Sequence, residues 1–116
     1  MHNHAYQAKK SFGNDIIEFY VAKGGETEFL VNDEFDLLDA SKRHPGVCKF
    51  LIRCFNEASN QLDTLWATAL DGDEHERARA KAYARFFPHS LVWEGITVYY
   101  KGDPQIVLVE ADKRYS

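Results

Sequence analysis

A six-residue segment in the middle of the chain, Arg43-His44-Pro45-Gly46-Val47-Cys48, has the composition of an anion-binding turn. Pro45 suits the first turn of a helix, because its missing N–H would lack a partner there anyway, and Gly46 lets a ligand approach the backbone closely. The start of a helix also leaves backbone N–H groups and a partial positive charge pointing outward. The segment therefore predicts a phosphate-binding turn. Its candidate binding residues are Arg43, His44, Gly46, Val47 and Cys48.

A helix is expected directly behind this turn, because apolar residues recur there at spacings of three and four. These residues are Val47, Leu51, Cys54, Phe55, Ala58 and Leu62. A second helix is expected from Asp73, which can cap it, to about Phe86, before Pro88 ends it. Its Arg77, Lys81 and Arg85 share one face, which either meets a phosphate or an acidic partner or is simply solvated.

The remaining segments favour strands. Short β-rich runs at 16–21 and 28–31 flank the hairpin-type sequence Lys23-Gly24-Gly25-Glu26. The uncharged run at 64–70 predicts a buried central strand, and 91–100 and 105–110 predict two further strands joined by a turn at 101–104. Residues 1–14 carry little pattern and predict either a loosely ordered arm or an edge segment. Residues 34–40 predict a short helical turn in preference to a further strand.

The expected order is strand, strand, helix, strand, helix, strand, strand, in a single domain that spans residues 1–116. This order indicates a layered α/β (α+β) domain with a mixed sheet. Because a helix connects the run at 28–31 to the run at 64–70, these two strands are expected to be parallel, whereas the terminal pairs are expected to be antiparallel.

The composition of the chain disfavours several classes of function. The chain has 116 residues, a net charge of -4 and interspersed acidic and basic residues, which disfavours a nucleic-acid partner. No apolar run approaches the roughly 20 residues of a membrane span, and the polar start does not resemble a signal peptide, so a cytoplasmic protein without membrane contact is expected. The sequence contains no CxxC or HExxH and no ligand cluster, so no metal site is predicted.

The element order, together with Arg43-x-x-Gly46-x-Cys48 at the start of the first long helix, resembles the acetyl-CoA-binding half of the GNAT family of N-acetyltransferases. The resemblance covers residues 15 to 110. It implies a three-layer GNAT-like fold in which the turn cradles the pyrophosphate of acetyl-CoA, with Cys48 at the position of the small last residue of the family motif. Ala82-Tyr83-Ala84 near the end of the second helix is similar to the family's late-helix sequence. It implies that Tyr83 protonates the departing thiolate.

The general base has several candidates. Glu28 and Glu94 are the carboxylates best placed on strands to face a sheet cleft, and His89 is a further candidate. Each also has a simpler interpretation, since Glu28 and Glu94 can be exposed strand residues and Tyr83 can be a packing aromatic. Cys48, similarly, can be a small packing residue.

A second resemblance concerns Leu62-Asp63-Thr64-Leu65-Trp66 and Phe29-Leu30-Val31-Asn32, which look like the reduced acetyltransferase-like proteins of short-tailed bacteriophages. Together the resemblances imply a small acetyltransferase that acetylates an amine on a protein or a small molecule. The alternative is a non-enzymatic, host-directed inhibitor or virion protein that uses the same fold to bind a protein. The short segment before Arg43 fits an acceptor that itself completes the site, or a chain that has lost catalysis.

Overall fold

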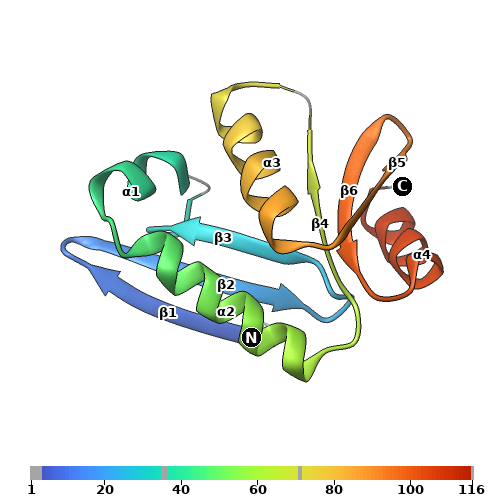
Figure 1. The fold of residues 1–116 in the computed structure, drawn as a ribbon, viewed down its shortest axis with the longest axis horizontal. Coiled ribbons are helices and arrows are strands. Elements are labelled where there is room, and N and C mark those ends of the chain that lie inside the picture. The colour runs from blue at the N-terminus through green and yellow to red at the C-terminus, as the bar shows by residue number, and fades with distance from the viewer. Residues whose placement is uncertain (1–3, 35–36, 71, 116) are drawn as a thin grey trace.

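The computed structural model describes residues 4–34, 37–70 and 72–115, which form two three-stranded antiparallel sheets and the helices around them (Figure 1). The first sheet has the order β1 (His4–Phe12), β2 (Asp15–Ala22), β3 (Thr27–Val31). The second has the order β4 (Leu65–Ala69), β6 (Ile96–Lys101), β5 (His89–Trp93). The sheets meet at one parallel bridge between Glu26 and Trp66, from which β3 and β4 diverge (Figure 1).

The predicted hairpin is confirmed, because β2 and β3 pair in antiparallel register from Ile17–Val31 to Val21–Thr27. Alternate residues of both strands are buried on the face covered by α2 (Val47–Gln61). Of the two alternatives for the first residues, the edge segment holds and a loose arm is wrong over residues 4–12. They form the edge strand β1, because the alternating side chains of Tyr6, Ala8 and Phe12 pack against the core.

The two long helices follow their sequence signals. Gly46 is the N-cap of α2, and the predicted apolar stripe from Val47 to Ala58 is buried. Asp73 caps α3 (Glu74–Phe86), since its Oδ1 accepts a hydrogen bond from the Glu76 N–H at 3.0 Å. A short helix, α1 (Leu37–Arg43), precedes α2, so a helical turn was the better prediction for its part of residues 34–40. Phe35 and Asp36 lie outside the described residues.

The C-terminal prediction is wrong in two places. Residues 91–100 are not one strand, because the chain turns at Glu94 and Gly95, which adopt φ values of 50° and 77°, and the β5–β6 hairpin results. Residues 105–110 belong to a helix, α4 (Pro104–Tyr115). The helix is favoured because Val107 and Ala111, four residues apart, are both buried in the cluster around Trp66.

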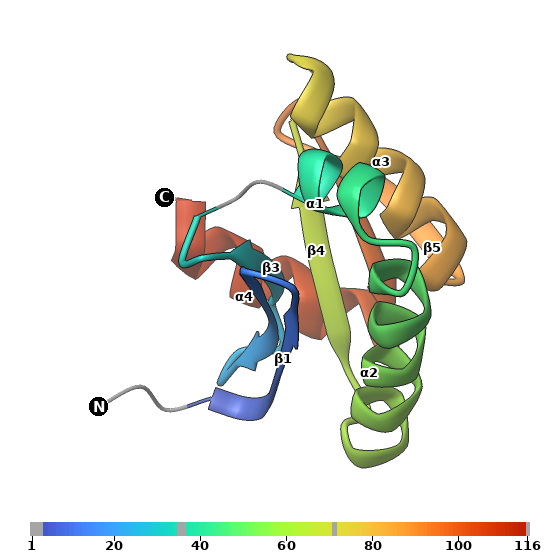
Figure 2. The ribbon, with the colours of Figure 1, turned by 90° about the vertical axis from the view of Figure 1, so that its left-hand side faces the viewer.

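The general α+β class is therefore confirmed, but the element order and sheet differ from those expected. In place of one mixed sheet, the described residues form two antiparallel sheets with a single parallel bridge. In Figure 2, α2 and α3 lie on one side of β4, and α4 lies on the other. Among the described residues, no helix is both long and apolar enough to cross a membrane.

Candidate functional site: the cleft between β3 and β4

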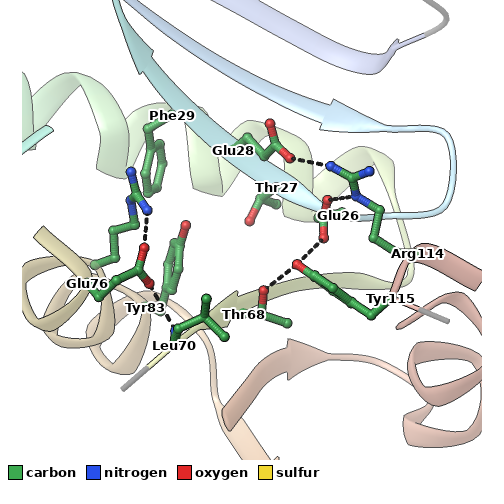
Figure 3. Close-up of a pocket in the computed structure, with 11 residues that line it drawn as sticks. Glu26, Thr27, Glu28, Phe29, Thr68, Leu70, Glu76, Tyr83, Arg114 and Tyr115 are labelled. Carbon is green, nitrogen blue, oxygen red and sulfur yellow. Dashed lines mark hydrogen bonds and ion pairs between the residues drawn. The ribbon is translucent and has the colours of Figure 1, made fainter. Parts of the chain in front are cut away.

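A pocket of about 200 Å³ lies where β3 and β4 diverge (Figure 3). Its walls come from four elements, namely β3, β4, α3 and the last turn of α4. The lining combines carboxylates, guanidinium groups and hydroxyl groups with the aromatic ring of Phe29. The divergence of the two strands thus produces a polar cleft beside the core.

Tyr83 projects into this cleft from α3. Its side chain is only 4% exposed, and its ring stacks on Phe29 with the ring centroids 5.6 Å apart. The hydroxyl points into the pocket, and among the residues that the structure describes it has no hydrogen-bond partner (Figure 3). Burial raises the pKa of this hydroxyl, so it remains protonated. Because the hydroxyl opens onto the cleft, a ligand there can accept a hydrogen bond from it.

A pair of glutamates forms the opposite wall. Glu26 lies just before β3 and Glu28 lies within it, and because they are two residues apart they share one face of the extended chain. Glu28 also stands opposite Tyr20 in the register of β2 and β3, and the Tyr20 hydroxyl donates a hydrogen bond to it. Local strand geometry therefore suffices to bring the two carboxylates together.

The last turn of α4 contacts this pair. Arg114 Nε donates to Glu26 Oε1 at 3.2 Å, and Arg114 Nη2 lies 3.9 Å from Glu28 Oε1. The Tyr115 hydroxyl lies 3.2 Å from Glu26 Oε2 and 2.7 Å from Thr68 Oγ1. Burial and the neighbouring Glu28 raise the pKa of Glu26 to about 7, although Arg114 acts in the opposite direction. Glu26 can therefore accept and release a proton near neutral pH.

The backbone of β3 also faces the cleft. In antiparallel pairs the hydrogen-bonded residues alternate, and the bonds Ala22 N to Glu26 O and Asn32 N to Ile16 O fix which residues point toward β2. By this alternation the N–H of Phe29 points away from β2, toward the gap that separates β3 from β4. The cleft thus receives a backbone donor next to the Tyr83 ring.

The structure brings two of the three predicted catalytic residues together. Tyr83 and Glu28 line the same pocket, whereas Glu94 lies at the exposed turn between β5 and β6, beside Trp93 and Ile96. Its position is wrong for a cleft residue, because the predicted strand is interrupted there by the turn. His89, the further candidate, is exposed at the start of β5 and does not line this pocket.

The predicted phosphate turn is only partly available. Arg43 Nε and His44 Nε2 both contact Asp15 Oδ2, at 3.1 and 2.8 Å. Hydrogen bonds from His44 and Asn32 are the main reason that the pKa of Asp15 falls to about 2. The side chain of Val47 is fully buried, and its N–H bonds to the His44 carbonyl at 3.2 Å. Asp15 therefore engages Arg43 Nε and His44 Nε2, and the buried side chain of Val47 is not accessible to a ligand.

Cys48 remains accessible beside Gly46. It lines a groove of about 170 Å³ between α2 and α3, together with Lys81 and Arg85 of the predicted basic face. The third member of that face, Arg77, instead donates a hydrogen bond to the Gly72 carbonyl. Two cations therefore lie beside the start of α2, where a phosphate is favoured by the helix field.

Sequence reasoning missed Glu26, Arg114 and Tyr115. The spacing of Glu26 and Glu28 was a usable signal, since alternate residues of a strand share a face. No comparable local signal marks Arg114 and Tyr115, because a long-range contact places them. Comparisons with protein-family models, curated proteins and solved structures found no match to this chain. The chemistry of the cleft is therefore the basis for assigning a function.

Proposed function

We propose that this protein is a GNAT-like N-acetyltransferase that uses acetyl-CoA and acetylates an amine in the cleft between β3 and β4. The proposal is carried by the hydroxyl of Tyr83, which has no hydrogen-bond partner among the described residues and faces the cleft shared with the glutamate pair (Figure 3). A proton donor and a proton acceptor on opposite walls are what acetyl transfer to an amine requires.

Each group has a distinct role. Glu26, whose pKa is about 7, takes the proton from the acceptor ammonium so that the nitrogen lone pair becomes available. The Phe29 N–H polarises the acetyl carbonyl as the C–N bond forms. Tyr83 gives its proton to the sulfur as the C–S bond breaks, which is consistent with the raised pKa that keeps this hydroxyl protonated beforehand. The second proton, which the nitrogen loses as the amide forms, restores the Tyr83 hydroxyl. Glu28 tunes Glu26 through their contact.

The groove between α2 and α3 is the proposed seat of the CoA phosphates. Arg43 and His44 contact Asp15. Lys81 and Arg85, which line the groove, are therefore the cations that neutralise the negative charge of the phosphates. The amides at the start of α2 beside Cys48 provide hydrogen bonds. Because α1 packs against both α3 and β3, a ligand reaching from this groove to the cleft passes along α1.

The direct test is a calorimetric titration of the protein with acetyl-CoA, repeated with Cys48→Glu and its neutral match Cys48→Gln. Saturable binding is expected for the wild type and for Cys48→Gln. Cys48→Glu should weaken binding about tenfold or more, since a carboxylate then faces the phosphates. Acids in the first turn of a helix usually stabilise it by about 0.3–1 kcal/mol, so lost affinity would not reflect unfolding.

Gly46 is a less suitable position for this test. A Cβ at Gly46 would lie 3.0 Å from Phe12 Cε1, so substitution there disturbs the packing of β1 as well as the turn. If acetyl-CoA does not bind at millimolar concentration, the acetyltransferase proposal fails. The non-enzymatic alternative, a host-directed or virion protein that binds another protein, would then be preferred.

A further inference from the structure

We propose that the last turn of α4 is an internal plug, in which Arg114 occupies the position of a cationic ligand, and that an aliphatic ammonium group displaces Arg114 to reach Glu26 and Glu28. The identification of this ammonium as the acetyl acceptor rests on the proposed function. The plug itself rests on contacts and burial.

A cation already sits on the glutamate pair. The guanidinium of Arg114 spans both carboxylates, with Nε 3.2 Å from Glu26 Oε1 and Nη2 3.9 Å from Glu28 Oε1. Figure 3 shows the Arg114 side chain reaching these carboxylates from α4. An ammonium group offers the same charge and also donates hydrogen bonds to carboxylates. The geometry thus defines the class of ligand that can replace Arg114.

The two sides of this contact differ in burial. The Glu26 side chain is 9% exposed, whereas that of Arg114 is 61% exposed, so the carboxylate is fixed in the fold and the guanidinium is the removable partner. Tyr115, the other plug residue, is 44% exposed. An ion pair with one largely solvated partner contributes little net stability, so competition by another cation is energetically feasible.

Arg114 also separates two hollows. It lines the cleft of about 200 Å³ and a neighbouring pocket of about 390 Å³, and Glu26 and Glu28 line both. The neighbouring pocket includes the rings of Tyr20 and Trp66 and the carboxylate of Glu110. The carboxylates of this pocket suit an aliphatic cation. Withdrawal of Arg114 would open a path from this pocket to the Tyr83 hydroxyl.

The last turn of α4 is weakly anchored. Val107 and Ala111 bury the preceding turns against the cluster around Trp66. Beyond Ala111, the described contacts of Arg114 and Tyr115 are their polar contacts at the cleft and a ring contact between Tyr115 and Trp93 at 6.3 Å. Segments with few buried apolar contacts open at low free-energy cost. The plug can therefore leave while the rest of the helix stays docked.

The test uses calorimetry on the full chain with spermidine as the probe and without acetyl-CoA. We expect Arg114→Gln to bind spermidine about tenfold more tightly than the wild type, because the internal competitor is gone. Arg114→Lys, which keeps the cation, should bind like the wild type. In the Arg114→Gln background, Glu28→Gln should abolish the gain. Lys49→Gln removes the same charge on the exposed face of α2, outside both pockets, and should change affinity by at most about twofold.

Equal or weaker binding by Arg114→Gln, with its melting curve intact, would overturn the plug, and so would absence of binding by every variant at millimolar spermidine. A neutral diol of similar length must not bind. A lysine-containing peptide tested in parallel identifies the source of the ammonium group, according to which of the two binds more tightly. Because the spermidine titration contains no acetyl-CoA, it tests the plug alone. The acetyl-CoA titration tests the proposed function, so the two failures can be told apart.

Discussion

Arg114 Nε and Glu26 Oε1 lie 3.2 Å apart although their residues are separated by 88 positions in the chain. This contact closes the acidic wall of the cleft with the last turn of α4. The ion pair with Arg114 lowers the pKa of Glu26 by less than burial raises it, so that the pKa of this carboxyl is about 7. The electrostatics of the cleft therefore depend on how the C-terminal helix docks.

The first prediction concerns stability and pH. Between the ordinary pKa of Glu26, 4.5, and its folded value of about 7, the folded protein binds more protons at this site than the unfolded chain. The stabilisation that the Glu26 carboxyl contributes is therefore fully present below its unfolded pKa of 4.5, and it is lost as the pH rises through its folded pKa of about 7. We expect the free energy of unfolding to fall by about 1–3 kcal/mol from this group between about pH 5 and pH 8.

Urea unfolding at several pH values checks this expectation. Glu26→Gln should remove that part of the slope, because the amide does not titrate. Glu94→Gln, a matched change at the exposed β5–β6 turn, should keep the slope of the wild type. A slope that survives in Glu26→Gln would assign the pH dependence to other groups.

The fold was predictable where local pattern and tertiary packing agree. The period of two in Ile17, Phe19 and Val21 and the helical stripe from Val47 to Ala58 both mark faces that the core buries. The C-terminal segment is different. Its apolar run at 106–109 favours a strand locally, but the distant partner Trp66 selects the residues four apart, Val107 and Ala111, and hence a helix. Strand-favouring residues flank Glu94 and Gly95 on both sides, so the local sequence predicted one strand across this turn.

The candidate site follows the same division. Tyr83 and Glu28 could be singled out because each sits in a locally predictable element and projects toward the cleft. Arg43 and His44 were assigned to a phosphate, yet Asp15, which is far from them in the sequence, engages both. Charged side chains acquire their roles from such partners, and local spacing does not reveal them.

The second prediction separates packing from chemistry at Tyr83. Tyr83→Phe should change the free energy of unfolding by less than about 1 kcal/mol, since among the described residues the hydroxyl has no partner to lose. Tyr83→Ala should cost about 3–5 kcal/mol, because it removes a buried ring stacked on Phe29. For acetyl transfer, Tyr83→Phe should lower turnover about 100-fold through loss of the proton donor.

Stopped assays of CoA release, together with urea unfolding of the same preparations, provide both readouts. Tyr99→Phe is the matched control, because its ring lies 5.9 Å from that of Tyr83 but does not line the cleft. It should leave turnover near that of the wild type. Unchanged turnover in Tyr83→Phe would reduce Tyr83 to a packing residue.

The third prediction concerns the narrow end of the cleft. Gly25 adopts a φ of 94°, and its carbonyl accepts the Trp66 N–H at 2.9 Å beside the bridge that joins the two sheets. A Cβ at Gly25 would lie 2.9 Å from the Thr64 carbonyl oxygen and 3.3 Å from Trp66 Cδ1. Gly25→Ala therefore adds a backbone collision to the strain of a positive φ, and β3 and β4 must move apart where they now meet.

Gly95→Ala provides the matched control, because Gly95 has a φ of 77° but nothing lies within 4 Å of the added Cβ. Gly95→Ala should cost about 1 kcal/mol from backbone strain, and Gly25→Ala should cost at least about 2 kcal/mol more. Urea unfolding gives the difference. Gly25→Ala should also weaken acetyl-CoA binding, since moving the bridge displaces the Phe29 N–H relative to Tyr83. Equal costs for the two variants would mean that the strands yield at Gly25 without strain and that the bridge does not set the geometry of the cleft.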